Sequence, residues 1–184
     1  VLFRSAQLNG LAILPPANSD ADFALSVSVT STEANGGAAT TVGTLNVTVD
    51  PAAAAPMVLV TDATGNEDSA IPLNIGVALM DIDGSESISE VLVSGVPSGA
   101  TLSAGTNNGN GTWTLTPEQL NGLSITPPAN SDADFALTVS ATSTEANGGA
   151  ATTLATLNVT VDSVADAPSV TQEQSRTGPD GRRR

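Results

Sequence analysis

Two aspartates separated by one residue, Asp81 and Asp83, follow an apolar stretch and open the segment Asp-Ile-Asp-Gly-Ser-Glu, which ends at Glu86. Side chains two residues apart on a strand point to the same side, so these two carboxylates would lie about 5 Å apart. At an effective dielectric of about 20 their repulsion amounts to about 3 kcal/mol. A divalent cation bound by Asp81, Asp83 and Glu86 would remove that cost.

The ligand types of this segment select among cations. Carboxylate oxygens on a flexible turn favour Ca²⁺, because transition metals prefer His or Cys and Mg²⁺ resists full dehydration. The segment is not an EF-hand loop, since it lacks the third acidic position and has Leu92 where the closing Glu would stand. The alternative is an Asp/Gly turn whose charges are simply hydrated. The absence of Lys and Arg partners nearby favours calcium.

Acidic residues dominate the charge of the chain. Its formal net charge is −14, 18 of its 19 acids lie between residues 20 and 173, and all 5 basic residues lie outside that range. Such a field repels nucleic acid and anionic lipid and attracts divalent cations. We therefore expect no nucleic-acid binding, and the short apolar stretches predict no membrane insertion.

Catalytic chemistry has few residue types to draw on. The chain contains no His, Cys, Lys or Tyr, so acid–base catalysis would depend on carboxylates alone, and no base is present to activate Ser or Thr. The single tryptophan, Trp113, lies in an alternating pattern that is typical of a core position. We expect the protein not to be an enzyme.

Residues 7–56 recur at 119–168 with 41 identities in 50 positions, at a constant offset of 112. Such a duplication is typical of tandem repeats. It divides the chain into the C-terminal half of a truncated repeat (7–56), one complete repeat (57–168), and the start of a further linker followed by a disordered or artefactual tail (169–184). Residues 1–6 do not match their counterparts and are interpreted as a scar. We expect unpaired strand edges and poor order in the half-repeat, since its covering strands are missing.

Alternating runs of Val, Ile, Thr and Leu predict short β-strands separated by turns rich in Gly, Asn, Pro and Ser. The strands are expected at 70–75, 90–93, 112–116, 135–141 and 154–161. The turn at 105–112 predicts a hairpin between 100–103 and 112–116. One short helical turn is predicted after Thr116, with Gln119 three residues on. The pattern predicts an all-β fold of Ig-like or cadherin-like antiparallel β-sandwich repeats with a period of 112 residues.

Further acidic residues fall at expected strand ends and in linkers. Each alone is more often a turn or cap residue than a ligand. They are Asp20, Asp22, Asp50, Glu67, Asp68, Asp132, Asp134, Glu145, Asp162 and Asp166. Their order along the chain resembles that of cadherin-type repeats, a family in which calcium ions lie between successive domains.

A closer resemblance is to the Ig-like or cadherin-like extender repeats of giant RTX-type bacterial adhesins. It covers residues 7–170 and depends on the motifs NEDSAIPLNIG, DIDGSE, GNGTWTLTPEQLNGLSITPP, ANSDADFALTVSATSTE and VDSVADAP. The resemblance implies a biofilm-associated, type I secreted protein on the surface of a Gram-negative cell, whose repeats hold an adhesive tip away from the cell. It leaves the target of adhesion open.

By position, the resemblance assigns two sets of calcium ligands. At the first junction they are Asp20, Asp22, Asp50, Asp81, Asp83 and Glu145. Toward a following repeat they are Glu67, Asp132, Asp134, Asp162 and Asp166. Because Ala54 stands where the second copy has Asp166, we expect weaker calcium binding at the first junction.

Two functions remain open from the sequence. The first is a non-catalytic structural spacer, whose partners are neighbouring repeats of the same chain and whose junctions are stiffened by Ca²⁺. The second is an adhesive module that captures glycans or other ligands with the help of calcium, through the loop between Asn107 and Asn110 and nearby acids. In that loop, however, turn geometry already explains the Asn and Gly residues.

Overall fold

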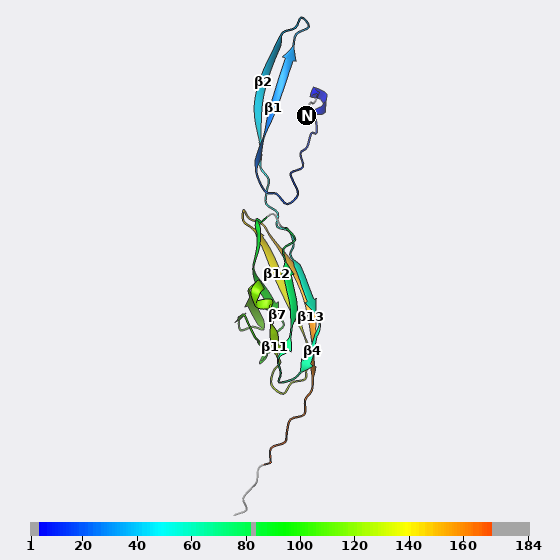
Figure 1. The fold of residues 1–184 in the computed structure, drawn as a ribbon, viewed down its shortest axis with the longest axis vertical. Coiled ribbons are helices and arrows are strands. Elements are labelled where there is room, and N and C mark those ends of the chain that lie inside the picture. The colour runs from blue at the N-terminus through cyan, green and yellow to red at the C-terminus, as the bar shows by residue number, and fades with distance from the viewer. Residues whose placement is uncertain (1–3, 82–83, 171–184) are drawn as a thin grey trace, which may run out of the picture.

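The computed structural model describes residues 4–81 and 84–170 (Figure 1). Nearly all of its regular structure is β, as the alternating sequence pattern predicted. The described helices are two 3-10 turns, η1 (Ser5–Gln7) and η2 (Pro117–Leu120). Within these ranges, no helix has both the length and the apolar character needed to cross a membrane.

Residues 57–162 form a body whose main layer is a six-stranded sheet with the order β4-β13-β12-β7-β10-β9. Its strands are β4 (Ala63–Asn66), β7 (Glu86–Ser94), β9 (Thr106–Asn107), β10 (Thr112–Leu115), β12 (Phe135–Glu145) and β13 (Ala150–Asp162). The smaller elements are a three-stranded sheet of β5 (Ile71–Pro72), β11 (Ser124–Thr126) and β8 (Thr101–Leu102), and the pair β3 (Met57–Thr61) and β6 (Asn74–Ala78).

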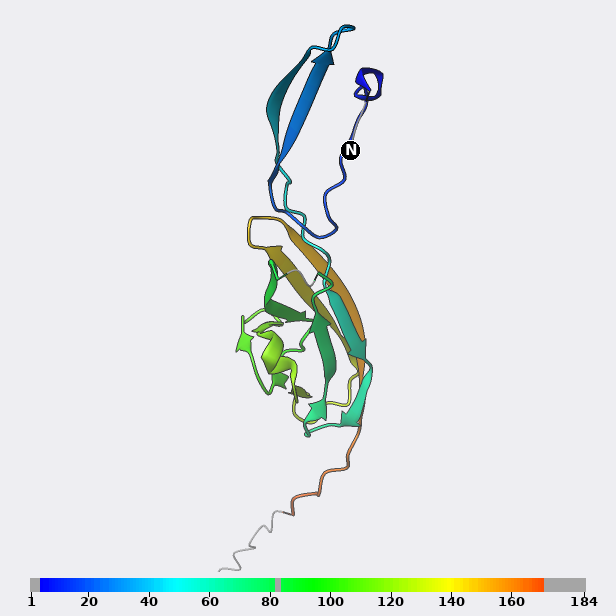
Figure 2. The same cartoon turned by 45° about the horizontal axis from the view of Figure 1, so that its top comes forward.

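One aliphatic core joins these layers. Val91 and Leu137 from the large sheet and Ile125 from the small sheet are all fully buried in the same cluster. Figure 2 shows the short strands and η2 on one side of the long strands β12 and β13. The arrangement is a sandwich-like, two-layer fold in which alternate residues of each strand face inward.

The strand pairing differs from the sequence prediction in two places. First, β13 pairs with β4 in parallel, so the sheet is not wholly antiparallel; the long connection between them provides the crossover that a parallel pair needs. Second, the strand before the Asn/Gly turn that pairs with β10 is β9, whereas β8 pairs with β11 in the other sheet. The residues 103–105 carry the chain between the two sheets.

The helical turn after Thr116 is confirmed. Thr116 donates its backbone N–H to Oε1 of Gln119 at 2.9 Å, and η2 follows directly. In return, Gln119 donates its backbone N–H to the carbonyl oxygen of Thr116 at 3.1 Å. The two bonds stabilise an N-terminus that would otherwise leave backbone donors unpaired. Leu120, at the end of η2, is buried in the core.

Residues 4–56 extend from one end of the body (Figure 1). Their regular structure is the hairpin of β1 (Phe23–Thr32) and β2 (Ala38–Val47), a two-stranded sheet whose outer edges pair with no other described strand. Residues 48–56 link this hairpin to β3. The linker runs close to the turn that joins β12 and β13: a Cβ on Gly149 would lie 3.3 Å from the Pro51 carbonyl oxygen.

Candidate metal centre at the end of the body

Three carboxylates come together where the linker enters the body. Asp81 lies in the turn after β6, Glu86 is the first residue of β7, and Glu145 is the last residue of β12. Because β7 and β12 are antiparallel neighbours, Glu86 lies directly opposite Glu145. Like charges in this position repel each other across the pair of strands.

A β-bulge turns Glu86 toward the interior. The register between β7 and β12 shifts between Ala141 and Ser143, with two residues of β7 opposite one of β12. Before the bulge, β7 buries the even-numbered position Glu86. After the bulge, it buries the odd-numbered positions Val91 and Val93. An unbroken alternation would have pointed Glu86 to solvent.

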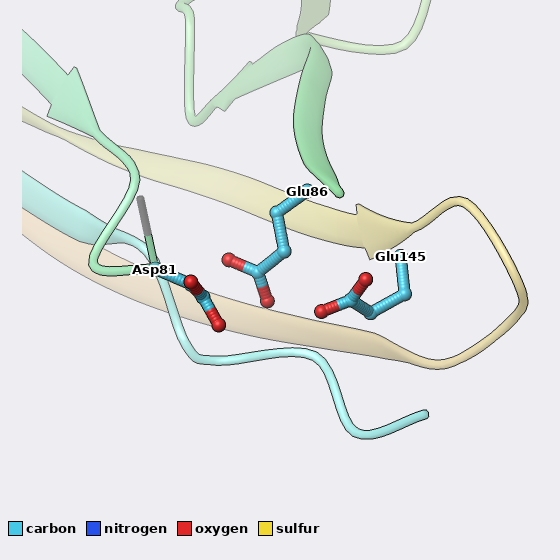
Figure 3. Close-up of side chains that lie close together, drawn as sticks. All are labelled: Asp81, Glu86 and Glu145. Carbon is cyan, nitrogen blue, oxygen red and sulfur yellow. The ribbon is translucent and has the colours of Figure 1, made fainter. Parts of the chain in front are cut away.

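The three carboxylates are buried and face one another (Figure 3). Their exposed fractions are 3% for Asp81, 6% for Glu86 and 9% for Glu145. One oxygen from each residue lies within 4.8 Å of the oxygens from the other two. The cluster has the residue types and the spacing to hold a metal ion.

The hydrogen bonds around the cluster leave oxygens unused. Oε1 of Glu86 accepts the backbone N–H of Ala54, and Oγ of Ser143 donates to the carbonyl oxygen of Ala54. The Oε2 atoms of Glu86 and Glu145 are buried and have no hydrogen-bond partner among the residues that the structure describes. Buried polar atoms are nearly always paired, and a bound cation would provide a partner for these two oxygens.

The electrostatics of the cluster favour a cation. Taking a carboxylate out of water costs several kcal/mol unless an opposite charge compensates it. Arg4 is the one basic side chain in the described part of the chain, and it lies in the exposed N-terminal segment. The described part of the chain therefore brings no basic side chain to the buried carboxylates of Glu86 and Glu145.

No family model and no curated protein matches this chain.

The acids expected from the earlier repeat lie together, apart from the buried cluster. Asp20, Asp22 and Asp50 line an open hollow of about 510 Å³ together with Asn147. Asn147 donates its side-chain amide to Asp20 at 2.7 Å, and Asp22 accepts the backbone N–H of Val49 at 2.9 Å. None of the three belongs to the buried cluster, and Asp83 lies outside the described residues. The expected first-junction ligands that the structure describes thus fall into two separate groups.

The acids expected to serve a following repeat lie at the far end of the body. Glu67 is buried and its Oε1 accepts the backbone N–H of Val164 at 2.8 Å, while Asp134 accepts that of Val161 at 2.8 Å. Asp132, Asp162 and Asp166 are exposed. In the described ranges no group of three close acids forms here. The structure therefore gives Glu67 and Asp134 a role in fixing the backbone.

Two residues with structural roles, Ser143 and Asp62, were not found from the sequence. Ser143 occupies an inward position of β12. The sequence could have indicated it, because it is a polar residue on the apolar face of an alternating strand. Asp62, between β3 and β4, accepts the backbone N–H of Asn158 at 2.7 Å. This bond and the hydrogen bonds from the side-chain amide of Asn158 lower the pKa of Asp62. Nothing in the sequence connects Asp62 with Asn158, because the contact depends on how β13 passes the corner before β4.

Proposed function

We propose that the cluster of Asp81, Glu86 and Glu145 binds Ca²⁺ and that the protein is a non-catalytic structural spacer made of calcium-stiffened β-sandwich repeats. The observation that carries the proposal is the pair of buried Oε2 atoms of Glu86 and Glu145, which have no hydrogen-bond partner among the described residues. An ion between them would convert an unfavourable contact into a stabilising one.

Calcium fits the donors better than other ions. All three side chains offer carboxylate oxygens, which suit hard cations. Ca²⁺ accepts irregular arrangements of six to eight oxygens, whereas Mg²⁺ requires a nearly ideal octahedron and retains several waters. The remaining positions would be filled by water or by nearby backbone carbonyls.

Binding at this place would act on the linker. Glu86 holds the N–H of Ala54 and Ser143 holds its carbonyl, so the linker is attached to the strands that carry two of the three carboxylates. Neutralising the carboxylates would hold Glu86 and Glu145 in place and, through Glu86, would hold Ala54. In this way the ion would limit bending between residues 4–56 and the body.

The wider setting of the proposal comes from the sequence. The 41 identities at an offset of 112 support an array of neighbouring repeats, and the motifs support an extender segment of a large bacterial surface adhesin, outside the cell. The net charge of −14 agrees with a protein that meets calcium in its surroundings and avoids nucleic acid.

Thermal unfolding in chelator, in millimolar calcium and in millimolar magnesium tests the proposal, with circular dichroism as the readout. We expect calcium to raise the unfolding temperature, by an amount equivalent to about 2.7 kcal/mol when free calcium is a hundred times Kd, and magnesium to do less. Glu86→Gln should abolish the response. In chelator, this variant should be at least as stable as the wild type, since it keeps the acceptor for Ala54 and loses a repulsive charge. Identical melting curves in calcium and chelator would refute the proposal.

A second candidate function depends on the hollow beside β10. Asn107, Asn110 and Trp113 line it, and its volume is about 420 Å³. An indole with side-chain amides suits a neutral, hydroxyl-rich ligand such as a sugar. No carboxylate from the described residues lines the hollow, so they give no basis there for the calcium dependence expected of a glycan-binding module. Titration with simple sugars, followed by the fluorescence of the single Trp113, tests this candidate.

A further inference from the structure

Asparagine is followed by glycine at six places in the chain: Asn9, Asn35, Asn108, Asn110, Asn121 and Asn147. In such a pair the backbone nitrogen of the glycine can attack the side-chain amide carbon of the asparagine, because glycine has no side chain to obstruct the approach. The reaction requires a glycine nitrogen that is free to act as a nucleophile and an asparagine carbonyl group that is polarised for attack. The structure distinguishes the six sites by both requirements.

Three of the six glycines donate their backbone N–H groups in hydrogen bonds. The bonds run from Gly36 to the carbonyl oxygen of Glu33 at 3.0 Å, from Gly148 to that of Glu145 at 3.2 Å, and from Gly109 to Oδ1 of Asn107 at 2.8 Å. Each bond must break before the nitrogen can react, which adds to the barrier. The fold therefore protects Asn35, Asn108 and Asn147.

The glycines of the other three sites donate no hydrogen bond to any residue that the structure describes; they are Gly10, Gly111 and Gly122. The asparagines before them, Asn9, Asn110 and Asn121, are all exposed to solvent. At these sites the glycine nitrogen is available, so a difference in reactivity must come from the asparagine carbonyl group and from the backbone around it.

Asn110 differs from the other two in the contacts of its carbonyl group. Oγ1 of Thr112 donates to Oδ1 of Asn110 at 2.6 Å and itself accepts the side-chain amide of Asn108 at 3.2 Å. Hydrogen bonds in such a chain polarise one another, and this one makes the amide carbon of Asn110 more susceptible to attack. Among the described residues, none makes a side-chain hydrogen bond to Asn9 or Asn121.

The backbone around Asn110 also suits the reaction. Asn110 lies in the turn between β9 and β10, between Gly109 and Gly111, whose φ angles are +86° and +76°. Glycine on both sides lets the backbone adjust at low cost as the glycine nitrogen approaches the side chain. Both Asn110 and Gly111 line the open hollow of about 420 Å³ beside β10, so water reaches the site.

We propose that Asn110 is a site of spontaneous covalent modification, at which the chain converts this asparagine into aspartate and isoaspartate with water as the only co-reactant. The Gly111 nitrogen loses its proton to hydroxide and forms a bond to Cγ of Asn110. The electron pair of the C=O bond moves to Oδ1, where the Thr112 hydroxyl stabilises the negative charge. The C=O bond forms again as the Cγ–Nδ2 bond breaks, and ammonia leaves with a proton taken from water. The product is a five-membered succinimide ring.

Water then opens the ring in one of two ways. Addition at Cγ breaks the new bond to the Gly111 nitrogen and gives aspartate. Addition at the backbone carbonyl carbon of Asn110 breaks that carbon's bond to the same nitrogen and gives isoaspartate, which adds a methylene group to the backbone. Either product brings a carboxylate to the hollow beside Trp113, where the described residues supply none. The longer backbone also lies next to Gly111, whose carbonyl oxygen accepts the N–H of Val96 at 3.1 Å.

Peptide mapping by mass spectrometry during incubation of the full chain at mildly alkaline pH tests the proposal. Asn121 serves as the reference site within the same molecule. We expect Asn110 to be converted about fivefold faster, the factor that corresponds to one neutral hydrogen bond. Thr112→Val removes the hydroxyl and should lower the rate at Asn110 to that at Asn121. In guanidinium chloride this variant and the wild type should be converted at Asn110 at equal rates, because the contact exists only in the folded chain.

Thr114→Val is the matched control. Thr114 lies two residues further along β10 and also accepts the side-chain amide of Asn108, at 3.1 Å, but it makes no contact with Asn110. We expect this variant to be converted at Asn110 as the wild type is. The proposal is overturned if Asn110 reacts no faster than Asn121 in the folded wild type, or if Thr112→Val leaves its rate unchanged. Faster conversion at the hydrogen-bonded sites than at Asn110 would also overturn it, because the fold would then not govern the reaction.

Discussion

Residues 7–56 and 119–168 differ at only 9 of 50 positions, yet one copy lies open to solvent and the other lines a core. Both form the same long hairpin with the same register. The comparison separates two levels of folding. Local pairing and turn chemistry are enough to specify the hairpin, whereas burial of its apolar face depends on residues 57–118.

The largest expected effect comes from removing the same leucine in each copy. Leu157 is fully buried and Leu45 is 54% exposed. Leu157→Ala should lower the free energy of unfolding by about 2 to 5 kcal/mol, because it leaves a cavity in a packed core. Leu45→Ala should change it by about 0.5 kcal/mol or less. Urea denaturation followed by Trp113 fluorescence measures both. Equal losses would mean that the first copy also has a core.

The next comparison concerns the carboxylate at the point where the first strand of each hairpin meets its turn. Glu145 belongs to the buried cluster, while its counterpart Glu33 is exposed. Glu145→Gln should remove most of the calcium-induced stabilisation, about 2.7 kcal/mol at a hundredfold excess of free calcium over Kd. Glu33→Gln should leave it intact. Thermal unfolding with and without calcium separates the two, and a loss in both variants would place the ion elsewhere.

A smaller effect is expected from the serine two residues earlier. Ser143 is fully buried and donates to the carbonyl of Ala54, whereas Ser31 is exposed. Ser143→Ala should cost about 1 kcal/mol, because the hydrogen bond is lost and the carbonyl is left in a partly buried place. Ser31→Ala should cost nothing measurable in the same urea titration. If Ser143→Ala were also neutral, the contact with the linker would not contribute to stability.

The smallest effect concerns acid. Hydrogen bonds from the backbone and the side chain of Asn158 lower the pKa of Asp62 from its ordinary value of 3.8. A carboxyl with a lowered pKa in the folded state contributes stability above its unfolded pKa and loses it as the pH falls through the folded value. Asp62→Asn should therefore reduce the loss of stability below about pH 4. Unfolding temperatures across this pH range check the slope, and unchanged slopes would exclude Asp62 as a source of acid sensitivity.

The sequence was sufficient for the features that depend on local pattern. Alternation located β10, β12 and β13, and turn chemistry located the helical turn after Thr116. Sequence-based prediction failed where the pairing of two strands depends on more than local pattern. The parallel pairing of β4 with β13 and the pairing of β9 rather than β8 with β10 depend on how the two layers pack.

The candidate site was predictable as a set of acids but not as an arrangement. Asp81, Glu86 and Glu145 were all expected ligands, and the structure brings them together. The sequence could not show that a bulge turns Glu86 inward, or that Asp20, Asp22 and Asp50 remain in a separate hollow. Both outcomes depend on strand register and on the path of the linker, which no local spacing specifies.

The parallel pairing of β4 with β13 has a mechanical consequence. The chain enters β4 at Ala63 and leaves β13 at Asp162, and the two strands run in the same direction. Tension applied to the two ends of the body would therefore slide these strands past each other and load all of their hydrogen bonds at once, instead of opening them one by one. Geometry of this kind resists pulling, as the proposed structural spacer would require.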